Sequence, residues 1–393
     1  MAGRSAAERL ELEAVRQAVM AVFAGQGFET IVPDILQPAD VFLDRSGENI
    51  RSRTFVFTDP SGAELCLRPD LTVPTCRFHL SRQADPRREA RYCYCGPAFR
   101  FQPGGADRLH PSEFDQAGVE WFGASDGELA EAEVLAMTVG AVEAAGLRRY
   151  TIRLGDLGLF DALLKSLVMP ERWRRRLSHQ FWRPKQFRAL LEQLTGGAAR
   201  PRTSISGLID TLAEAGGAAD AVGLVEAQLA AEGLALVGGR NSREIAARLV
   251  EKALDRSERP LLPADAEKIE TYLGLAGAPE DIAKALDRLA PTLGSPMVEA
   301  VRRFHRRNAL MTAAGLPLDE ARFAGVFGRQ LEYYTGFVFQ IEAADPDGGA
   351  LAIAGGGRYD RLLSDIGSPY PVPAVGCAIH TERLAAACRA VAR

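Results

Sequence analysis

The chain has 393 residues, of which 47% are hydrophobic and 25% are charged, a composition typical of a soluble globular protein with one large domain or two ordinary ones. Its formal net charge of -4 argues against broad electrostatic binding to nucleic acid. The first residues, MAGRSAAERLELEAV, lack the apolar core of a signal peptide, and no window approaches the roughly 20 uninterrupted apolar residues of a membrane span. We therefore expect a cytoplasmic protein with no membrane partner.

The N-terminal third predicts a helix followed by strands. Ser5 and Glu8 form a capping box, and apolar residues at helical spacing follow it. Residues 28–33 indicate a strand, and residues 53–70 indicate a hairpin around an Asp-Pro-Ser-Gly turn.

A second, longer hairpin is expected over residues 91–123, with a glycine-rich tip. Ser125 and Glu128 then predict another capping box at the start of a helix that closes at Gly146.

The composition changes in the middle of the chain. Alanine, leucine and charged residues dominate residues 155–315, which predicts a mostly helical insertion. The β pattern returns in residues 316–393, so the sheet would be built from this segment together with residues 1–154. Strands that precede and follow a block of helices favour an α+β domain with a mixed or antiparallel sheet.

The six cysteines are scattered without a C-x-x-C pair, and the chain has only five histidines. We therefore expect free thiols and no metal site. A Gly-rich stretch at 355–357 does not open a G-x-G-x-x-G unit, so no dinucleotide cofactor is expected either.

Several side chains in the predicted strands suit the recognition of a free amino acid, which presents an ammonium, a carboxylate and a side chain. They combine acids and acceptors, planar cations, and phenol rings with polar tips. For an imidazole side chain, a carboxylate at one ring nitrogen and a phenol at the other form a natural pair. The candidates are Asp70, Thr72, Arg100, Gln116, Glu120, Arg329, Tyr333, Tyr334 and Tyr359.

Five sequence blocks resemble the class II aminoacyl-tRNA synthetases, and histidyl-tRNA synthetase in particular. GPAFR at 96–100 with EFDQAGVE at 113–120 resembles motif 2, and Pro33 resembles the motif 1 proline. The other blocks are LRPDLT at 67–72, RQLEYYTG at 329–336, AGGGRYD at 354–360 and PAVGCAIHTERL at 373–384. The resemblance implies a class II synthetase-like sheet flanked by helices.

The resemblance also implies roles for the candidate residues. Asp70, Thr72 and Gln116 resemble the ligands of the substrate's α-amino group, with Asp70 in place of a longer glutamate. The imidazole contacts correspond to Glu120 and Tyr334, and the carboxylate contact to Arg329.

The residues at the positions where a synthetase binds ATP depart from the synthetase pattern. His110 and Ser112 stand where the hairpin arginines are expected, and His380 replaces a glycine against which adenine would lie. Arg100 and Arg383 remain as cations. Only ten residues follow Arg383, so no anticodon-binding domain and no tRNA partner are expected.

A synthetase-like chain that keeps the amino-acid pocket but lacks a working ATP site resembles the regulatory subunits of ATP phosphoribosyltransferase. These subunits are paralogues of histidyl-tRNA synthetase. The resemblance implies a non-catalytic role in the first step of L-histidine biosynthesis. It further implies a short-form catalytic subunit as partner, L-histidine as feedback effector, and self-association through the motif 1 region. Histidine could bind in the synthetase-like pocket or at the contact with the catalytic subunit. The alternatives are an active histidyl-tRNA synthetase or histidine-activating ligase, and a free-standing histidine sensor or RNA-binding adaptor.

One basic segment has two interpretations. Residues 171–188, ERWRRRLSHQFWRPKQFR, interleave arginines with aromatic residues, a mixture that can bind single-stranded nucleic acid. We favour an amphipathic helix pair with its aromatic residues inward and its arginines solvated; an acidic protein partner is a further use.

Overall fold

The computed structural model describes residues 3–43, 52–107, 109–196, 221–231, 242–328, 333–344 and 349–391. The chain forms two compact units, one made of Met1–Ser166 with Thr271–Arg393 and the other of Leu167–Glu270. The predicted helical insertion, 155–315, is wider than the second unit. It also includes α6 (Leu157–Ser166), α13 (Pro279–Leu289) and α14 (Ser295–Ala313), which pack within the first unit as a layer over its sheet.

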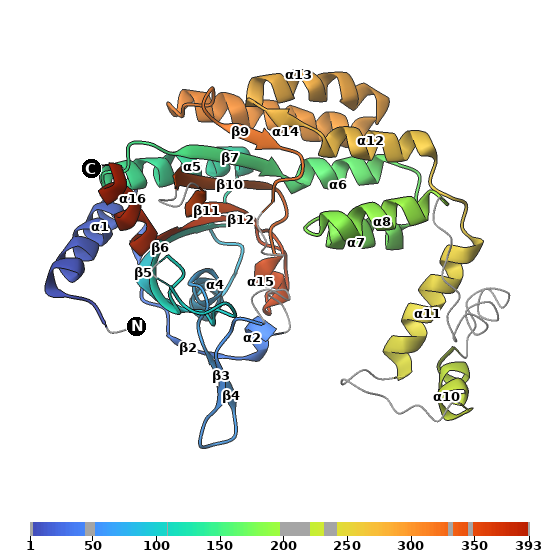
Figure 1. The fold of residues 1–393 in the computed structure, drawn as a ribbon, viewed down its shortest axis with the longest axis horizontal. Coiled ribbons are helices and arrows are strands. Elements are labelled where there is room, and N and C mark those ends of the chain that lie inside the picture. The colour runs from blue at the N-terminus through green and yellow to red at the C-terminus, as the bar shows by residue number, and fades with distance from the viewer. Residues whose placement is uncertain are drawn as a thin grey trace. The chain divides into compact units, whose positions relative to one another are not determined.

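A nine-stranded sheet forms the centre of the first unit (Figure 1). Its strands pair antiparallel, except for the parallel pairs β1–β5 and β7–β9. In spatial order the strands are β1 (Glu29–Thr30), β5 (Ala90–Phe99), β6 (Glu113–Phe122), β12 (Ala374–His380), β11 (Ala350–Arg358), β10 (Phe337–Ala344), β7 (Thr151–Asp156), β9 (Arg322–Ala324) and β8 (Ala276–Gly277).

The two predicted hairpins are present. β5 and β6 form the long one, and the shorter one lies in a separate three-stranded sheet of β2 (Leu36–Pro38), β4 (Glu64–Leu67) and β3 (Val56–Thr58). Arg68 connects this small sheet to the large one, because its guanidinium donates to the backbone oxygens of Pro33 and Pro97.

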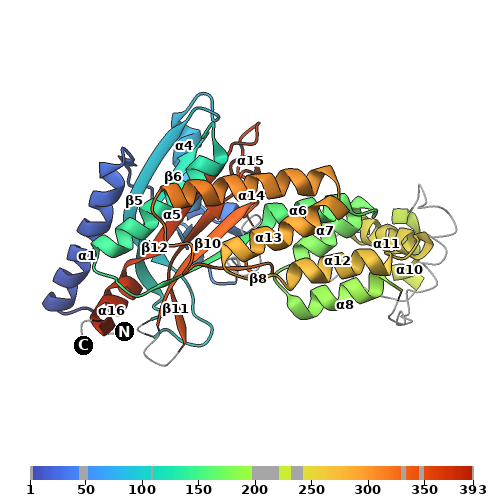
Figure 2. The ribbon, with the colours of Figure 1, turned by 90° about the horizontal axis from the view of Figure 1, so that it is seen from above.

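Helices cover the large sheet in layers. α5 packs on β10, β11 and β12, and α14 packs on α5 and α6 (Figure 2). The helices of this unit are α1 (Ala6–Gly25), α2 (Asp40–Leu43), α4 (Thr72–Arg82), α5 (Gly127–Ala144), α6 (Leu157–Ser166), α13 (Pro279–Leu289), η1 (Ala290–Thr292), α14 (Ser295–Ala313), α15 (Leu362–Asp365) and α16 (Thr381–Val391).

The second unit is helical in its described part. It consists of α7 (Glu171–Gln180), α8 (Pro184–Leu194), α10 (Ala221–Ala231), α11 (Ser242–Ser257) and most of α12 (Pro263–Leu273). Trp173, Phe181 and Phe187 are buried and Trp182 is half-buried, as the amphipathic interpretation of residues 171–188 predicts. Its arginines are solvated only in part, because Arg172 and Arg176 are half-buried and pair with Asp255.

The predicted capping box is present at α1, but the predicted cap of α5 is at the wrong residue. Ser5 and Glu8 form the predicted reciprocal capping box of α1. At α5 the prediction is wrong by one residue, because the Asp126 side chain, not that of Ser125, accepts from the backbone N–H of Leu129. Both residue types cap helices well, so the sequence alone does not separate neighbouring candidates.

The two faces of the sheet have different surroundings near residue 359. Arg358 extends toward α5 and reaches Glu131 at 3.3 Å, whereas Tyr359 lies in the opposite direction and bonds Glu120. This alternation is the ordinary side-chain pattern of a strand and its flanks. It leaves one face for helix packing and the other for a cavity.

No helix in the described ranges is long and apolar enough to cross a membrane. Within the same ranges, no group of three or more His, Cys, Asp or Glu side chains could hold a metal ion.

Candidate functional site

A cavity of about 470 Å³ opens on the sheet face opposite α5. Strands β6, β11 and β12 supply its floor, and the segment before α4 supplies part of its wall. Eight of the nine candidate residues line it: Asp70, Thr72, Arg100, Gln116, Glu120, Tyr333, Tyr334 and Tyr359. The ninth, Arg329, lies outside the described residues.

Glu120 is the most deeply buried acid of the cavity, with 1% of its surface exposed. Its Oε1 accepts a hydrogen bond from the Tyr94 hydroxyl at 2.9 Å, and its Oε2 accepts one from Tyr359. Burial raises the pKa of Glu120 to about 8, although the bonds from Tyr359, Thr72 and Tyr94 oppose the rise. The carboxyl group is therefore poised to hold or release a proton near neutral pH.

Gly376 makes room for this carboxyl group. It faces Glu120 across the β6–β12 pair, and a Cβ at this position would lie 1.8 Å from Glu120 Oε2. A side chain on β12 here would push Glu120 out of its bonds with the tyrosines. The glycine is thus needed for close approach.

Asp70 offers an unused acceptor to the cavity. Its Oδ1 accepts from the backbone N–H of Val73 at 3.1 Å, near the start of α4. Its Oδ2 is buried and has no hydrogen-bond partner among the described residues. Burial raises the pKa of Asp70, while the nearby Arg100 cation opposes the rise. A buried acceptor without a partner costs free energy, which a cationic ligand would recover.

Gln116 and Arg100 brace the same wall. Gln116 Oε1 accepts from the backbone N–H of Leu71 at 3.2 Å, and Arg100 Nε donates to the Pro69 carbonyl oxygen at 2.7 Å. Both contacts hold the 69–72 segment in place. Asp70 and Thr72 are thereby fixed before any ligand arrives.

Three tyrosine rings close another side of the cavity. The Tyr333 and Tyr334 ring centroids lie 4.7 Å apart, and Tyr359 meets them edge-on at 5.6 and 6.3 Å. The rings belong to the hydrophobic core cluster of this unit, so packing fixes their positions. They give the cavity an aromatic wall beside Glu120.

The imidazole ring of His380, at the end of β12, occupies another part of the cavity wall. The His380 side chain stacks on Phe114, with centroids 4.2 Å apart and planes inclined by 22°. Arg100 lies over the same phenyl ring at 5.1 Å. Arg383 is committed to backbone oxygens, bonding Leu109 at 2.8 Å and Ala352 at 3.1 Å. The flat surface of Phe114 is thus already covered within the chain.

Sequence reasoning missed three residues that complete the site. Tyr94 holds Glu120 from the neighbouring strand, where it pairs with Gly118. The alternation in RYCYC could have placed it on the same face. Arg53 and Arg153 add cations to the cavity lining. They come from segments without a matching block, so only the tertiary structure identifies them.

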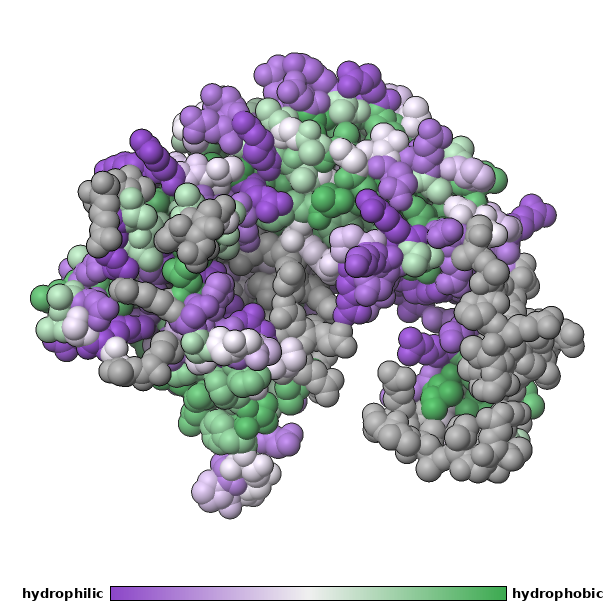
Figure 3. Space-filling model, viewed as in Figure 1, coloured by the Kyte–Doolittle hydropathy of each residue, from purple (hydrophilic) through white to green (hydrophobic). Residues whose placement is uncertain are grey.

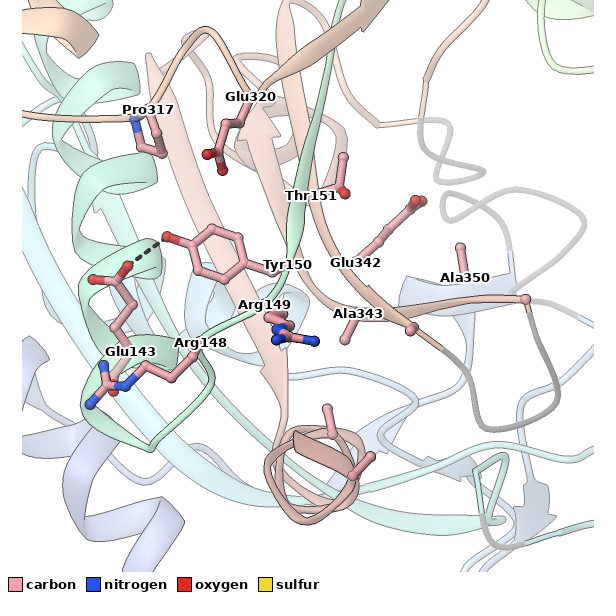
Figure 4. A pocket seen from close by; sticks show the side chains of 14 residues that line it. Glu143, Arg148, Arg149, Tyr150, Thr151, Pro317, Glu320, Glu342, Ala343 and Ala350 are labelled. Atoms are coloured by element: carbon pink, nitrogen blue, oxygen red, sulfur yellow. Dashed lines mark hydrogen bonds between the residues drawn. The ribbon is translucent and has the colours of Figure 1, made fainter. Parts of the chain in front are cut away.

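A larger cavity, of about 1160 Å³, lies elsewhere in the first unit (Figure 4). Arg148 and Arg149 line it together with Glu143, Glu320 and Glu342, and the Tyr150 hydroxyl donates to Glu143 at 2.6 Å. None of the candidate residues lines it. Its mixed charges select no ligand class.

Comparison with known proteins gives a consistent result. A family model described as Histidyl-tRNA synthetase matches residues 4–236 and 219–384. Among solved structures, an ATP phosphoribosyltransferase regulatory subunit/histidyl-tRNA synthetase from Bacillus halodurans is similar, with a TM-score of 0.66, 20% identity and coverage of 97% of this chain and 79% of that chain. A Histidine--tRNA ligase subunit from Alicyclobacillus acidocaldarius has a TM-score of 0.61 at 25% identity and covers 100% and 97%.

Curated relatives are more similar in sequence. The ATP phosphoribosyltransferase regulatory subunit of Chelativorans sp. (strain BNC1) is 36% identical over 97% of this chain and 96% of its own length. The protein of the same name from Mesorhizobium japonicum is 37% identical over 95% and 97%. Together with the class II synthetase-like sheet, these similarities show that the chain belongs to the family of ATP phosphoribosyltransferase regulatory subunits.

Proposed function

We propose that this protein is a non-catalytic subunit that binds L-histidine in the cavity between Asp70 and Glu120. Bound to a short-form ATP phosphoribosyltransferase catalytic subunit, it is needed for activity in the first step of histidine biosynthesis and transmits feedback inhibition. The observation that carries the proposal is the buried Oδ2 of Asp70, which has no hydrogen-bond partner in the part of the chain that the structure describes and lies in the same cavity as the Glu120–tyrosine cluster.

The two ends of histidine match two parts of the cavity. The α-ammonium is a cation that would bond Asp70 Oδ2 and neighbouring acceptors. The imidazole is a flat ring with two nitrogens, which suits the tyrosine wall and the Glu120 carboxyl group. Arg329 remains the proposed carboxylate ligand.

The proposed lack of catalysis follows from the crowded end of the cavity. Amino-acid activation requires ATP to lie beside the amino acid, with its base on a flat surface and its phosphates neutralised. His380 covers the Phe114 ring, so the base would lack this flat surface, although Arg53, Arg100 and Arg153 still line the cavity. The remaining arrangement favours binding without adenylate formation.

Titration calorimetry and reconstitution together test the proposal. L-Histidine should bind the purified chain, and the chain should activate a short-form catalytic subunit whose activity histidine then inhibits. Inhibition requires histidine to bind one arrangement of the complex more tightly than another. Glu120→Gln should weaken both binding and inhibition, whereas the exposed Glu133→Gln should change neither.

Two results would contradict this function. Histidine-dependent exchange of pyrophosphate into ATP by the purified chain would show an activating enzyme. Unchanged inhibition in Glu120→Gln would place the effector at another site, such as the contact with the catalytic subunit.

We also propose that the protein self-associates through the region around Pro33. Apolar side chains are exposed there and on the adjoining small sheet, including Val32 at 83%, Leu36 at 52% and Phe57 at 40%. Figure 3 shows a hydrophobic surface where β2, β3 and β4 lie in Figure 1. Apolar surface gathered in one place commonly marks a protein interface.

A further inference from the structure

The second unit contains a basic cavity of about 620 Å³ between α7, α8 and α11. It shares no lining residue with the proposed histidine site. Its cations are Arg172, Arg175, Arg176, Arg248 and Lys252, and His179, Gln180, Gln186 and Gln193 add further polar groups.

The charge of this cavity is not balanced by its acids. Glu251 is the one carboxylate in its lining, and it bonds Arg175 at 2.9 Å. Behind the lining, Asp255 and Glu258 pair with arginines of α7. Among the described residues, these three carboxylates pair with Arg172, Arg175 and Arg176, whereas Arg248 and Lys252 form no ion pair.

Asp255 fixes the arginines in advance. This buried carboxylate accepts from Arg172 Nε at 2.8 Å, from Trp173 Nε1 at 2.5 Å, and from Arg176. Trp173 is also buried, with 3% of its surface exposed, so its hydrogen bond keeps the Asp255 carboxylate from moving toward solvent. The guanidinium groups are held before a ligand binds, which reduces the entropy lost on binding.

On these grounds we propose that the cavity binds a small anion that carries two or more linked phosphates. Planar guanidinium groups match phosphate oxygens, and the glutamine amides can donate further hydrogen bonds. A cavity of this volume fits a compact, nucleotide-sized ligand. The described lining of the cavity contains no Phe, Tyr or Trp side chain, so it offers no row of stacking surfaces for a nucleic-acid strand. This site goes beyond the proposed histidine function and does not depend on it.

Calorimetric titration of inorganic pyrophosphate and tripolyphosphate into the full chain at low ionic strength tests the site. The double variant Arg248→Gln/Lys252→Gln removes two exposed lining cations of α11 that hold no ion pair among the described residues. It should weaken tripolyphosphate binding by at least about tenfold, because each charge-assisted hydrogen bond contributes strongly.

The matched control is Lys185→Gln/Arg188→Gln, which removes two exposed cations of α8 outside the cavity and should retain native affinity. Both double variants should bind histidine as the native chain does, which shows that the first unit is intact.

Three outcomes would overturn the proposal. The first is no binding of either polyphosphate to the native chain. The second is equal weakening in both double variants, or none in the cavity variant, which would place the anion elsewhere. The third is binding of a single-stranded oligoribonucleotide or an acidic peptide that tripolyphosphate does not displace.

Discussion

Glu120 and Asp70 are both buried acids of one cavity, but their oxygens are satisfied differently. Glu120 has hydroxyl partners on both oxygens, whereas Asp70 Oδ2 has none among the described residues. The first acid is thus adapted to share a proton with a ring nitrogen. The second is adapted to receive a cation.

Histidine binding should show a bell-shaped pH dependence. Near pH 7 free Glu120 is protonated, because its pKa is about 8, and free imidazole is mostly neutral, so the complex forms with one shared proton and no net exchange. Above pH 8 the acid loses this proton and binding must take one up. Below about pH 6.5 the imidazole is protonated and binding must release one.

Affinity should therefore fall on both sides of this window, by up to about tenfold per pH unit. Calorimetry from pH 5.5 to 9 measures it. The high-pH limb should be weaker in Glu120→Gln, which cannot titrate, and only the fall caused by the ligand's own α-ammonium should remain. A native affinity that does not change across pH 8 would contradict the assigned role.

Asp70→Asn should weaken histidine binding by about tenfold or more, because it replaces a charge-assisted bond to the ammonium by a neutral one. Imidazole alone, which lacks the ammonium, should bind both proteins equally. Calorimetry with the two ligands separates these effects. Equal loss for imidazole would indicate that the variant distorts the whole cavity.

At the scale of elements, the register of the β6–β12 pair determines whether the Glu120 carboxyl group has room to reach its tyrosine partners. The two strands meet at Glu120 and Gly376, and neighbouring β5 supplies Tyr94. Sheet register therefore assembles the cluster from the β5–β6 hairpin and from β12, which lies about 250 residues later in the chain. A helix-bearing segment, residues 69–72, supplies the remaining wall.

Gly376→Ala should abolish measurable histidine binding and lower the free energy of unfolding by on the order of 1–3 kcal/mol, because a Cβ would lie 1.8 Å from Glu120 Oε2. Gly140→Ala in α5 is the matched control. A Cβ there meets nothing within 4 Å, and alanine favours a helix by about 1 kcal/mol. Denaturant unfolding and calorimetry measure both variants. Native-like binding in Gly376→Ala would show that Glu120 can move without loss.

At the scale of the whole molecule, the exposed apolar surface around Pro33 and the small sheet predicts self-association. The double variant Leu36→Asp/Phe57→Asp should raise the dissociation constant by at least about tenfold, because burial of each side chain contributes about 1.5–3 kcal/mol. Sedimentation velocity over a range of concentrations measures it.

Val298→Asp is the control for this prediction. Val298 is a 50% exposed apolar residue of α14, away from the small sheet. It should leave association unchanged. A native chain that stays monomeric at high concentration, or equal dissociation in the control, would refute this interface.

The sequence by itself determined the parts that depend on local pattern. Turn residues and alternation located both hairpins, a capping box located α1, and matching blocks named eight residues that line one cavity. These signals work because strand period, turn chemistry and capping are short-range properties.

Only the tertiary structure decided which buried polar groups have hydrogen-bond partners and which do not. It showed that Tyr94 completes the Glu120 cluster and that Asp70 Oδ2 lacks a partner among the described residues. It also assigned α6, α13 and α14 to the sheet's own unit and brought α7 and α11 together around a basic cavity. Burial, register and long-range pairing arise from contacts between distant segments, and no local pattern in the chain contains them.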